Sequence, residues 1–389
     1  MNNFSYHNPT RILFGDGQIA AIAAEIPELA RIMLVYGGGS IKRNHVYEQI
    51  QETLGERIVS EFSGIEANPE YSTLCKAVTQ VKADKIDFLL AAGGGSVIDG
   101  TKFIAAAAQF NGEPWDILLQ GGRNVTSALP FGCILTLPAT GSEMNAGSVV
   151  NRSEMKAKMS FGSEHCFPQF SVLDPTTTLT LPERQLTNGI VDPFVHVIEQ
   201  YLTYPVGADL QDRLAEAVLQ SIVETGPKAL ADPQNYELRA NLMWCATMAL
   251  NGLLRNGVPQ DWSTHMIGHE LTALYGLDHA QTLAVVLPAN LRVRKDAKRE
   301  KLLQFGERLW GVTETSHPGS ADERIEAIIV KTEEFFIAMG APTRLADYGL
   351  DESAVDAVIK QLEQHNMVAL GEKKDVTLDV SRQILMAAL

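Results

Sequence analysis

Two Gly-Gly-Gly-Ser turns, each placed directly after a run of apolar residues, constrain the fold of this chain most strongly. The first turn, Gly37–Ser40, follows Ile32–Tyr36, and the second, Gly93–Ser96, follows Asp87–Ala92 and precedes an alanine-rich helical pattern. Apolar runs without polar alternation are typical of strands covered on both faces, and the order strand, turn, helix, strand predicts a parallel sheet. Two further strands of this kind are predicted at Cys133–Leu137 and Phe170–Leu173.

The sequence pattern changes near residues 178–182. Beyond this point strand-like runs almost vanish, and Leu181-Pro182-Glu183 is typical of a helix start, with proline at a first-turn position. A chain of 389 residues is also too long for one ordinary core. We therefore predict an α/β domain over residues 1–180 and an all-helical domain over residues 181–389. Helical periodicity is clearest at Asp209–Glu224, Leu238–Leu254 and Ala321–Met339.

Composition narrows the class of partner and the compartment. The net charge of −15, from 47 acidic and 32 basic residues, argues against nucleic acid or an anionic membrane as the main partner. The N-terminus shows no basic segment followed by an apolar one, and no apolar run reaches the ~18 residues of a membrane span. The four cysteines, Cys75, Cys133, Cys166 and Cys245, show no CxxC or paired spacing. Free thiols of this kind favour a cytoplasmic protein.

The two glycine turns are candidates for a nucleotide site. Successive glycines let the backbone approach a ligand closely, and a following helix N-terminus directs free amides at a phosphate. One such turn alone is equally well explained as a tight strand-to-helix connection, but two in register favour a nucleotide. Neither is a Rossmann fingerprint, because Lys42 and Ile98 stand where its third glycine would be. A Walker loop is also absent, since no Gly-Lys-Ser/Thr follows either turn.

The first turn carries information about which dinucleotide binds. An NAD site usually has a carboxylate for the ribose diol, and this group would repel a 2′-phosphate. Residues 37–43 contain no acid, but they provide the hydroxyl of Ser40 and the cations Lys42 and Arg43. This composition favours NADPH, although the two cations are also explained as solvated helix charges.

Histidines and one aspartate show the spacing of a metal site. Asp192 and His196 are four residues apart in a helical segment, so both side chains leave one face of the helix. His265 and His269 repeat this spacing on a helix that we expect to end at Gly276, and His279 follows closely. Hydrogen-bonded core histidines are the alternative explanation. Spacing alone therefore leaves five candidate ligands and does not decide whether His269 is one of them.

The donor types limit the choice of metal. Imidazole and carboxylate together suit Zn²⁺ or Fe²⁺ better than Mg²⁺ or Ca²⁺, which prefer oxygen ligands. The HExxH pattern of metalloproteases is absent, because Ala273 stands where its second histidine would be. Four protein ligands normally close a structural zinc site, so catalysis requires an additional coordination position. Iron supplies it readily and five-coordinate zinc also can, which leaves the metal open.

Four motifs resemble those of the iron-containing (group III) alcohol dehydrogenase family. They are GGGSVIDGTK at 93–102, LPATGSEMN at 137–145, NGIVDPFVHVIEQY at 188–201 and THMIGHELTALYGLDHAQTLAVVLP at 264–288. The resemblance covers essentially the whole chain, and the last two motifs are highly specific. The opening and closing segments, together with residues 37–40, are most similar to the branch of NADPH-dependent aldehyde reductases and butanol dehydrogenases.

The resemblance implies a function for each domain and a set of metal ligands. Residues 1–180 would form a Rossmann-like dinucleotide-binding α/β domain, and residues 181–389 an all-α metal-binding catalytic domain. The family's metal ligands fall on Asp192, His196, His265 and His279. His269 is similar to a family histidine that lies near the metal without binding it, and it becomes the candidate for the last member of a proton relay.

The resemblance also implies which residues contact NADP(H). Gly38 and Ser40 are expected at the 2′-phosphate, where NAD-using relatives carry an acid at the position of Gly39. The pyrophosphate and nicotinamide are expected to contact Gly94, Gly95, Ser96 and Asp99. The rest of the cofactor groove is expected to include Asn68, Thr136, Thr140, Asn145 and Lys158.

The expected reaction is reversible reduction of an aldehyde to a primary alcohol, by hydride transfer from NADPH to a metal-polarised carbonyl. The fold is shared with glycerol-dehydrogenase-like polyol oxidoreductases and dehydroquinate-synthase-like lyases, which remain alternatives, as does a metal or nucleotide sensor without enzymatic activity. Apolar residues near the metal helices, Leu254, Trp262 and Met266, either line a pocket for an aliphatic substrate or belong to the core. The family further implies a homodimer.

Overall fold

The computed structural model describes all 389 residues, and they form two compact units. The sheet unit contains His7–Pro182 and Pro233–Asn251, and the helical unit contains Met1–Tyr6, Glu183–Asp232 and Gly252–Leu389. These units do not correspond to one boundary at residue 180. Pro233–Asn251 belongs to the sheet unit, and Met1–Tyr6 belongs to the helical unit. The division into domains 1–180 and 181–389 stays a prediction.

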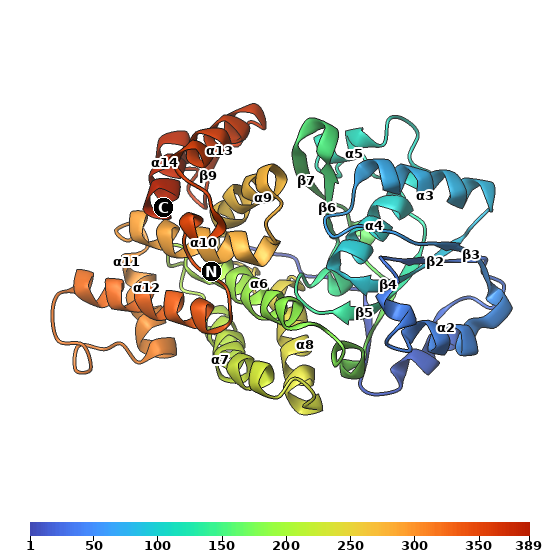
Figure 1. Cartoon of the computed structure of the whole chain (residues 1–389), viewed down its shortest axis with the longest axis horizontal. Coiled ribbons are helices and arrows are strands. Elements are labelled where there is room, and N and C mark those ends of the chain that lie inside the picture. Colours follow the sequence, from blue (N-terminus) through green and yellow to red (C-terminus); the bar gives the residue numbers. More distant parts are fainter. The chain divides into compact units, whose positions relative to one another are not determined.

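A six-stranded parallel sheet organises the sheet unit, with the strand order β1-β8-β5-β4-β2-β3 (Figure 1). The buried runs recognised in the sequence are strands β2, β4, β5 and β8, so the predicted α/β fold with a parallel sheet is confirmed. The strands span Arg11–Phe14 (β1), Ile32–Tyr36 (β2), Ile58–Phe62 (β3), Phe88–Gly94 (β4), Phe131–Leu137 (β5) and Phe170–Leu173 (β8).

Both faces of the sheet are covered, which explains the continuous apolar runs. In β2, Met33 and Val35 join a core shared with α3, α4 and α5, whereas Ile32, Leu34 and Tyr36 join a second core shared with α1 and α2. The helices are α1 (Ile22–Glu25), α2 (Val46–Leu54), α3 (Tyr71–Ala83), α4 (Gly95–Gln109), α5 (Trp115–Leu119) and α8 (Tyr236–Leu250). An antiparallel pair, β6 (Gly147–Arg152) and β7 (Ala157–Gly162), follows β5.

Strands β1 and β3 had no clear signal in the sequence, for a physical reason. They are the two edge strands of the sheet, and several of their side chains are partly or fully exposed. Edge strands therefore carry mixed sequences such as Arg-Ile-Leu-Phe and Ile-Val-Ser-Glu-Phe instead of continuous apolar runs. The predicted helix at Leu238–Leu254 ends earlier, at Leu250.

The helical unit contains almost no sheet, as its periodicity predicted. Its one pair of strands has two residues each, and the core lies between α9, α10, α13 and α14. None of the helices combines the length and apolar composition needed to cross a membrane. The elements are α6 (Glu183–Tyr201), α7 (Asp209–Ala231), α9 (Ser263–Tyr275), α10 (His279–Val293), α11 (Arg299–Phe305), α12 (Ala321–Ala338), α13 (Glu352–Gln364), α14 (Leu378–Ala387), β9 (Ala369–Leu370) and β10 (Val376–Thr377).

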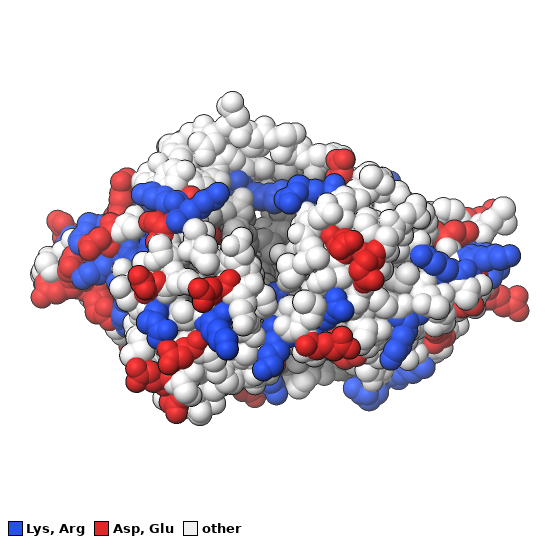
Figure 2. Space-filling model, turned by 90° about the horizontal axis from the view of Figure 1, so that it is seen from above, with Lys and Arg blue, Asp and Glu red and all other residues white.

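Basic and acidic side chains are interspersed on the face shown in Figure 2. On this face no broad basic field marks a docking surface for a polyanion.

Candidate metal centre and nucleotide site

The helical unit brings the four predicted ligands together from three helices. Asp192 and His196 lie one turn apart on α6, and His265 lies in the first turn of α9. Gly276 ends α9 in the left-handed conformation, with φ +69°, and His279 is the first residue of α10. This short connection lets α9 and α10 present their histidines at the same place.

Three imidazole nitrogens converge on one carboxylate oxygen. The distance from Asp192 Oδ1 is 3.3 Å to His196 Nε2, 3.8 Å to His265 Nε2 and 3.8 Å to His279 Nε2. The donor atoms of Asp192, His265 and His279 all lie within 4.8 Å of one another. His196 belongs to the cluster through its short approach to Asp192 and through its ring, which stacks on His265 with centroids 4.7 Å apart.

The chemistry of this cluster fits a divalent cation. Asp192, His196 and His265 are buried, yet Asp192 Oδ1 and His265 Nε2 have no hydrogen-bond partner. Buried polar atoms normally find a partner, because an unpaired group in the interior costs ~1–3 kcal/mol. A metal ion bound at the centre would satisfy both atoms, which are of the types that coordinate Zn²⁺ and Fe²⁺.

A carboxylate outside the cluster fixes the orientation of His265. Glu199 accepts a hydrogen bond from His265 Nδ1 and also from the backbone nitrogens of Thr264 (2.7 Å) and His265 (3.3 Å). Because this contact occupies Nδ1, Nε2 is the ring nitrogen that faces Asp192 and that would bind a metal ion. Sequence spacing had not singled out Glu199, since nothing in the motif distinguishes it from a helix carboxylate.

Electrostatics at the cluster favour added positive charge. Burial alone lowers the pKa of His265, but the carboxylates of Glu199 and Asp192 outweigh it and raise the pKa to about 9. His196, in contrast, has its pKa lowered to about 4, mainly by burial. The carboxylates that favour a proton at His265 would equally favour a metal cation in the same position.

His269 lies beside the cluster. Its ring centroid is 5.1 Å from that of His279 and 6.4 Å from that of His265, and it is not among the residues whose donor atoms are mutually close. Trp262 also packs against the cluster, with its ring centroid 5.1 Å from that of His265 and 6.2 Å from that of His196. Of the apolar residues singled out in the sequence, Trp262 contacts the histidines directly.

In the sheet unit, the candidate nucleotide residues follow the carboxyl ends of the strands. Residues 37–40 follow β2, Gly95 and Ser96 follow β4, and Thr136 lies near the end of β5. The carboxyl ends of parallel strands meet at one edge of a sheet, which is where open α/β folds bind nucleotides. The predicted residues Asn68, Thr140 and Asn145 lie in connections after β3 and β5, and Lys158 lies in β7.

The second glycine turn requires glycine for packing. A β-carbon on Gly94 would lie 2.9 Å from the β-carbon of Leu137, and one on Gly95 would collide with the side chain of Thr140. Helix α4 begins at Gly95, directly after the strand, so its first amides are free of intrahelical partners. Both the close approach of backbone and the helix N-terminus match the predicted phosphate site.

The first glycine turn has a different local structure. It leads into a short 3-10 turn, Ser40–Lys42, and α2 starts only at Val46. Gly39 has φ +87°, and added side-chain atoms on Gly38 or Gly39 would meet open space. Lys42 Nζ lies over the rings of Tyr36 and Tyr47, 5.2 and 4.6 Å from their centroids. The absence of side chains at Gly38 and Gly39 therefore leaves free space beside the turn. The ammonium group of Lys42 is exposed to solvent and also contacts the two aromatic rings.

A fully buried lysine that sequence analysis did not single out joins the candidate residues of the sheet unit. Lys102 Nζ donates to Ser142 Oγ (2.8 Å), Asn145 Oδ1 (2.9 Å) and the carbonyl of Gly147 (2.7 Å). Ser142 also donates to Asp99, whose other carboxylate oxygen accepts from the backbone of Val149. A separate bond of 2.9 Å joins Lys158 Nζ to Asn68 Oδ1. Lys102 lies three residues after Asp99 on α4, so both side chains leave the same face of the helix. This i,i+3 spacing is the sequence pattern from which Lys102 could have been predicted.

Comparison with known families decides the lineage. The model described as iron-containing alcohol dehydrogenase matches residues 9–175, and the model for the C-terminal part of that family matches residues 187–388. The chain belongs to the iron-containing alcohol dehydrogenase family. The two models together span both units, so the predicted family membership is confirmed over nearly the full length.

Individual members of the family resemble the chain along its entire length. The NADPH-dependent aldehyde reductase YqhD of Escherichia coli is 58% identical, with 100% of both chains covered. The NADP-dependent alcohol dehydrogenase 3 of Entamoeba histolytica is 40% identical and covers 99% of this chain and 98% of its own. The predicted branch of aldehyde reductases is therefore confirmed.

Solved structures of family members share the fold. The substrate- and cofactor-free form of the E. coli aldehyde reductase has a TM-score of 0.93 at 55% identity, with 100% of both chains covered. The NADH-dependent butanol dehydrogenase A of Thermotoga maritima has a TM-score of 0.93 at 33% identity, with 100% of this chain and 99% of that chain covered. The E. coli enzyme is named as NADPH-dependent and the T. maritima enzyme as NADH-dependent, so proteins with this fold differ in the dinucleotide that they are named for.

Proposed function

We propose that the protein is an NADP-dependent alcohol dehydrogenase that reduces aldehydes to primary alcohols, with a reversible reaction. The observation that carries the proposal is the convergence of three imidazole nitrogens on Asp192 Oδ1, where two buried donor atoms lack any other partner. Family membership and 58% identity to an NADPH-dependent aldehyde reductase support the same reaction.

In this proposal Asp192, His196, His265 and His279 hold one divalent metal ion. When bound, the ion supplies Lewis-acid polarisation of the carbonyl, and NADPH supplies the hydride. The protein binds and orients these groups: Glu199 fixes the His265 ring, and Trp262 packs against two of the histidines. The donor set suits Fe²⁺ and Zn²⁺ alike, and the family description names iron.

The proposed role of His269 is to pass a proton toward the alcohol oxygen. Its ring lies 5.1 Å from that of His279 between centroids, beside the proposed metal position but outside the group of mutually close donor atoms. An imidazole is suited to this task because its ordinary pKa lies near neutral pH.

The proposed cofactor site uses the carboxyl edge of the sheet. Gly38 and Ser40 would bind the 2′-phosphate of NADPH, because the first turn is open and carries no acid. We propose the following residues for the remaining contacts: Asn68, Gly94, Gly95, Ser96, Asp99, Thr136, Thr140, Asn145 and Lys158. A homodimeric state and a cytoplasmic location complete the proposal.

A substrate panel tests the function. We expect steady oxidation of NADPH with butanal and similar aliphatic aldehydes, and a lower kcat/KM when NADH replaces NADPH. A polyol oxidoreductase would instead turn over glycerol-type substrates in preference to unmodified aldehydes. A dehydroquinate-synthase-like lyase would show no net NADPH oxidation, and a sensor would bind NADPH without turnover. Any of these three results would refute the proposed activity.

A further inference from the structure

The segment that leads into α9 sets the position of His265. The backbone nitrogen of Asp261 donates to the carbonyl of Glu199 on α6, over 2.9 Å. Trp262 follows in the left-handed conformation, with φ +62°, and α9 begins at the next residue. A bulky residue with positive φ is strained, so its neighbours must hold it there.

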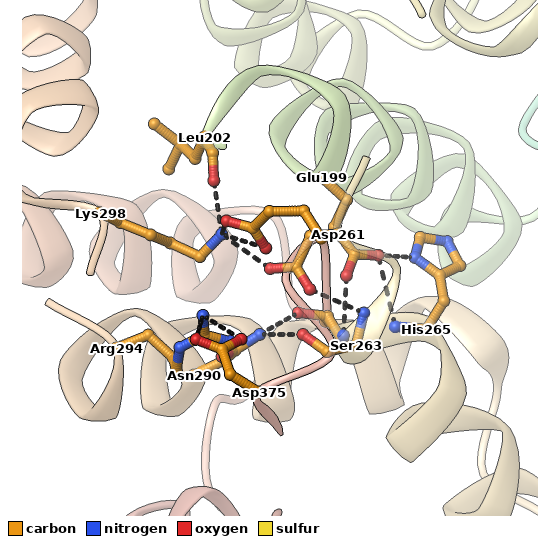
Figure 3. A network of polar contacts seen from close by, with 11 residues as sticks. Glu199, Leu202, Asp261, Ser263, His265, Asn290, Arg294, Lys298 and Asp375 are labelled. Atoms are coloured by element: carbon orange, nitrogen blue, oxygen red, sulfur yellow. Dashed lines mark hydrogen bonds and ion pairs between the residues drawn. The ribbon is translucent and has the colours of Figure 1, made fainter. Parts of the chain in front are cut away.

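A buried ammonium group holds the residue directly before this strained position. Lys298 Nζ lies 2.8 Å from Asp261 Oδ2 and 3.1 Å from Glu372 Oε1, and it also donates to the carbonyl of Leu202. The exposed fractions of the three side chains are 1% for Lys298, 4% for Asp261 and 1% for Glu372. Figure 3 shows the ammonium group of Lys298 directed at Asp261 and at the carbonyl of Leu202.

These three residues come from distant parts of the sequence. Lys298 follows α10, Asp261 precedes α9, and Glu372 lies in the connection between β9 and β10. Gly371 has φ +82°, and a β-carbon there would lie 3.2 Å from Arg294 Nη1 and 3.5 Å from Asp261 Oδ1. The positive φ disfavours any larger residue at Gly371, and the C-terminal hairpin lies in contact distance of Asp261, next to the position of Glu372.

A second set of contacts continues from Asp261 to the metal histidine. Asp261 Oδ1 accepts from the backbone nitrogen of Ser263 over 3.1 Å, and Asn290 donates to the hydroxyls of Ser263 and Thr264. Glu199, whose carbonyl holds Asp261, accepts from His265 Nδ1 with its side chain. The same residue thus fixes both the loop and the ring, and Figure 3 shows its carboxylate directed at His265.

We propose that Lys298 is a positioning residue for the metal centre: with Asp261 and Glu372 it holds the segment before α9 so that His265 and Trp262 keep their orientation. The inference rests on the proposed function, because it assigns a metal ion to the cluster. Buried ion pairs often contribute little net stability compared with apolar replacements. A role in fixing the geometry of the metal ligands would explain why three charged groups are buried here.

The test is a Lys298→Met variant loaded with Co²⁺, whose visible absorption reports ligand geometry. At a temperature well below unfolding, we expect the Co²⁺ dissociation constant to rise about 10- to 100-fold, as for other residues that orient metal ligands, and the Co²⁺ spectrum to shift. Lys295→Met is the matched control. Lys295 lies three residues before Lys298, and its ion pair with Asp322 is exposed. That variant should keep both properties.

A second variant separates positioning from folding, because Lys298→Met leaves two buried carboxylates without a cation. The triple variant Lys298→Met, Asp261→Asn, Glu372→Gln removes all three charges with little change of shape, and we expect it to fold yet bind Co²⁺ about 10- to 100-fold more weakly. Wild-type affinity and spectrum in either folded variant would overturn the inference. If wild-type protein itself bound no Co²⁺, the proposed function would fail instead.

Discussion

Replacing His279 with alanine is expected to remove the metal and lower kcat/KM for aldehyde reduction by at least about 10³-fold. The reason is that Lewis-acid stabilisation contributes several kcal/mol to the barrier, and each ~1.4 kcal/mol corresponds to a factor of ten. His279 suits this test because its side chain is 22% exposed, whereas the other proposed ligands are 4–5% exposed. Metal analysis of the purified variant, together with steady-state kinetics, measures both effects.

The neighbouring His269 provides the matched control. Its ring lies 5.1 Å from that of His279 between centroids, so both variants lose an imidazole from the same region. We expect His269→Ala to keep its metal and to lose about 10²- to 10⁴-fold in kcat, the range for loss of a general acid or base. If His269→Ala lost its metal, the proposed relay role would be wrong. If His279→Ala kept its metal, the proposed ligand set would be wrong.

A Gly39→Asp substitution is expected to lower kcat/KM with NADPH about 30-fold while leaving kcat/KM with NADH similar or higher. A carboxylate ~4 Å from a 2′-phosphate of charge about −2 costs about 2 kcal/mol even in a dielectric near that of water. The new side chain would enter open space, since nothing lies within 4 Å of a β-carbon built there. Steady-state kinetics with both cofactors measure the change.

The backbone at Gly39 requires its own control, because φ is +87° and any side chain there is strained. Gly39→Asn introduces the same strain and nearly the same shape without the charge, and asparagine tolerates the left-handed region. We expect this variant to retain its preference for NADPH. An unchanged ratio of NADPH to NADH efficiency in Gly39→Asp would contradict the assignment of the phosphate pocket.

The sequence predicted the interior of the fold better than its edges. Strands such as β2 and β8 are continuous or nearly continuous apolar runs because helices or connections cover both of their faces, and their bounds match the predicted ones. Edge strands β1 and β3 are partly exposed and carry mixed residues, so no periodic pattern marked them. The return of α8 to the sheet unit was also invisible, since helical periodicity does not say which core a helix joins.

At the site, the sequence predicted side chains that follow a regular spacing and missed those that act through tertiary contacts. Asp192 and His196 could be paired from their four-residue separation, because one helix turn places both on the same face. Glu199 contacts His265 on another helix, and Lys298 contacts Asp261 in the segment before α9, so both contacts join residues that are far apart in the sequence. No local pattern distinguishes such buried charges from ordinary surface ones before the fold is known.

NADPH-dependent aldehyde reduction is expected to require a metal ion at the cluster around Asp192. The most direct measurement is the rate of NADPH oxidation with butanal before and after removal of metal by a chelator, followed by titration with Fe²⁺ or Zn²⁺. We predict that the metal-free protein is inactive and that activity returns in proportion to the bound ion, saturating at about one ion per chain. Wild-type rates in metal-free protein would contradict a requirement for the ion.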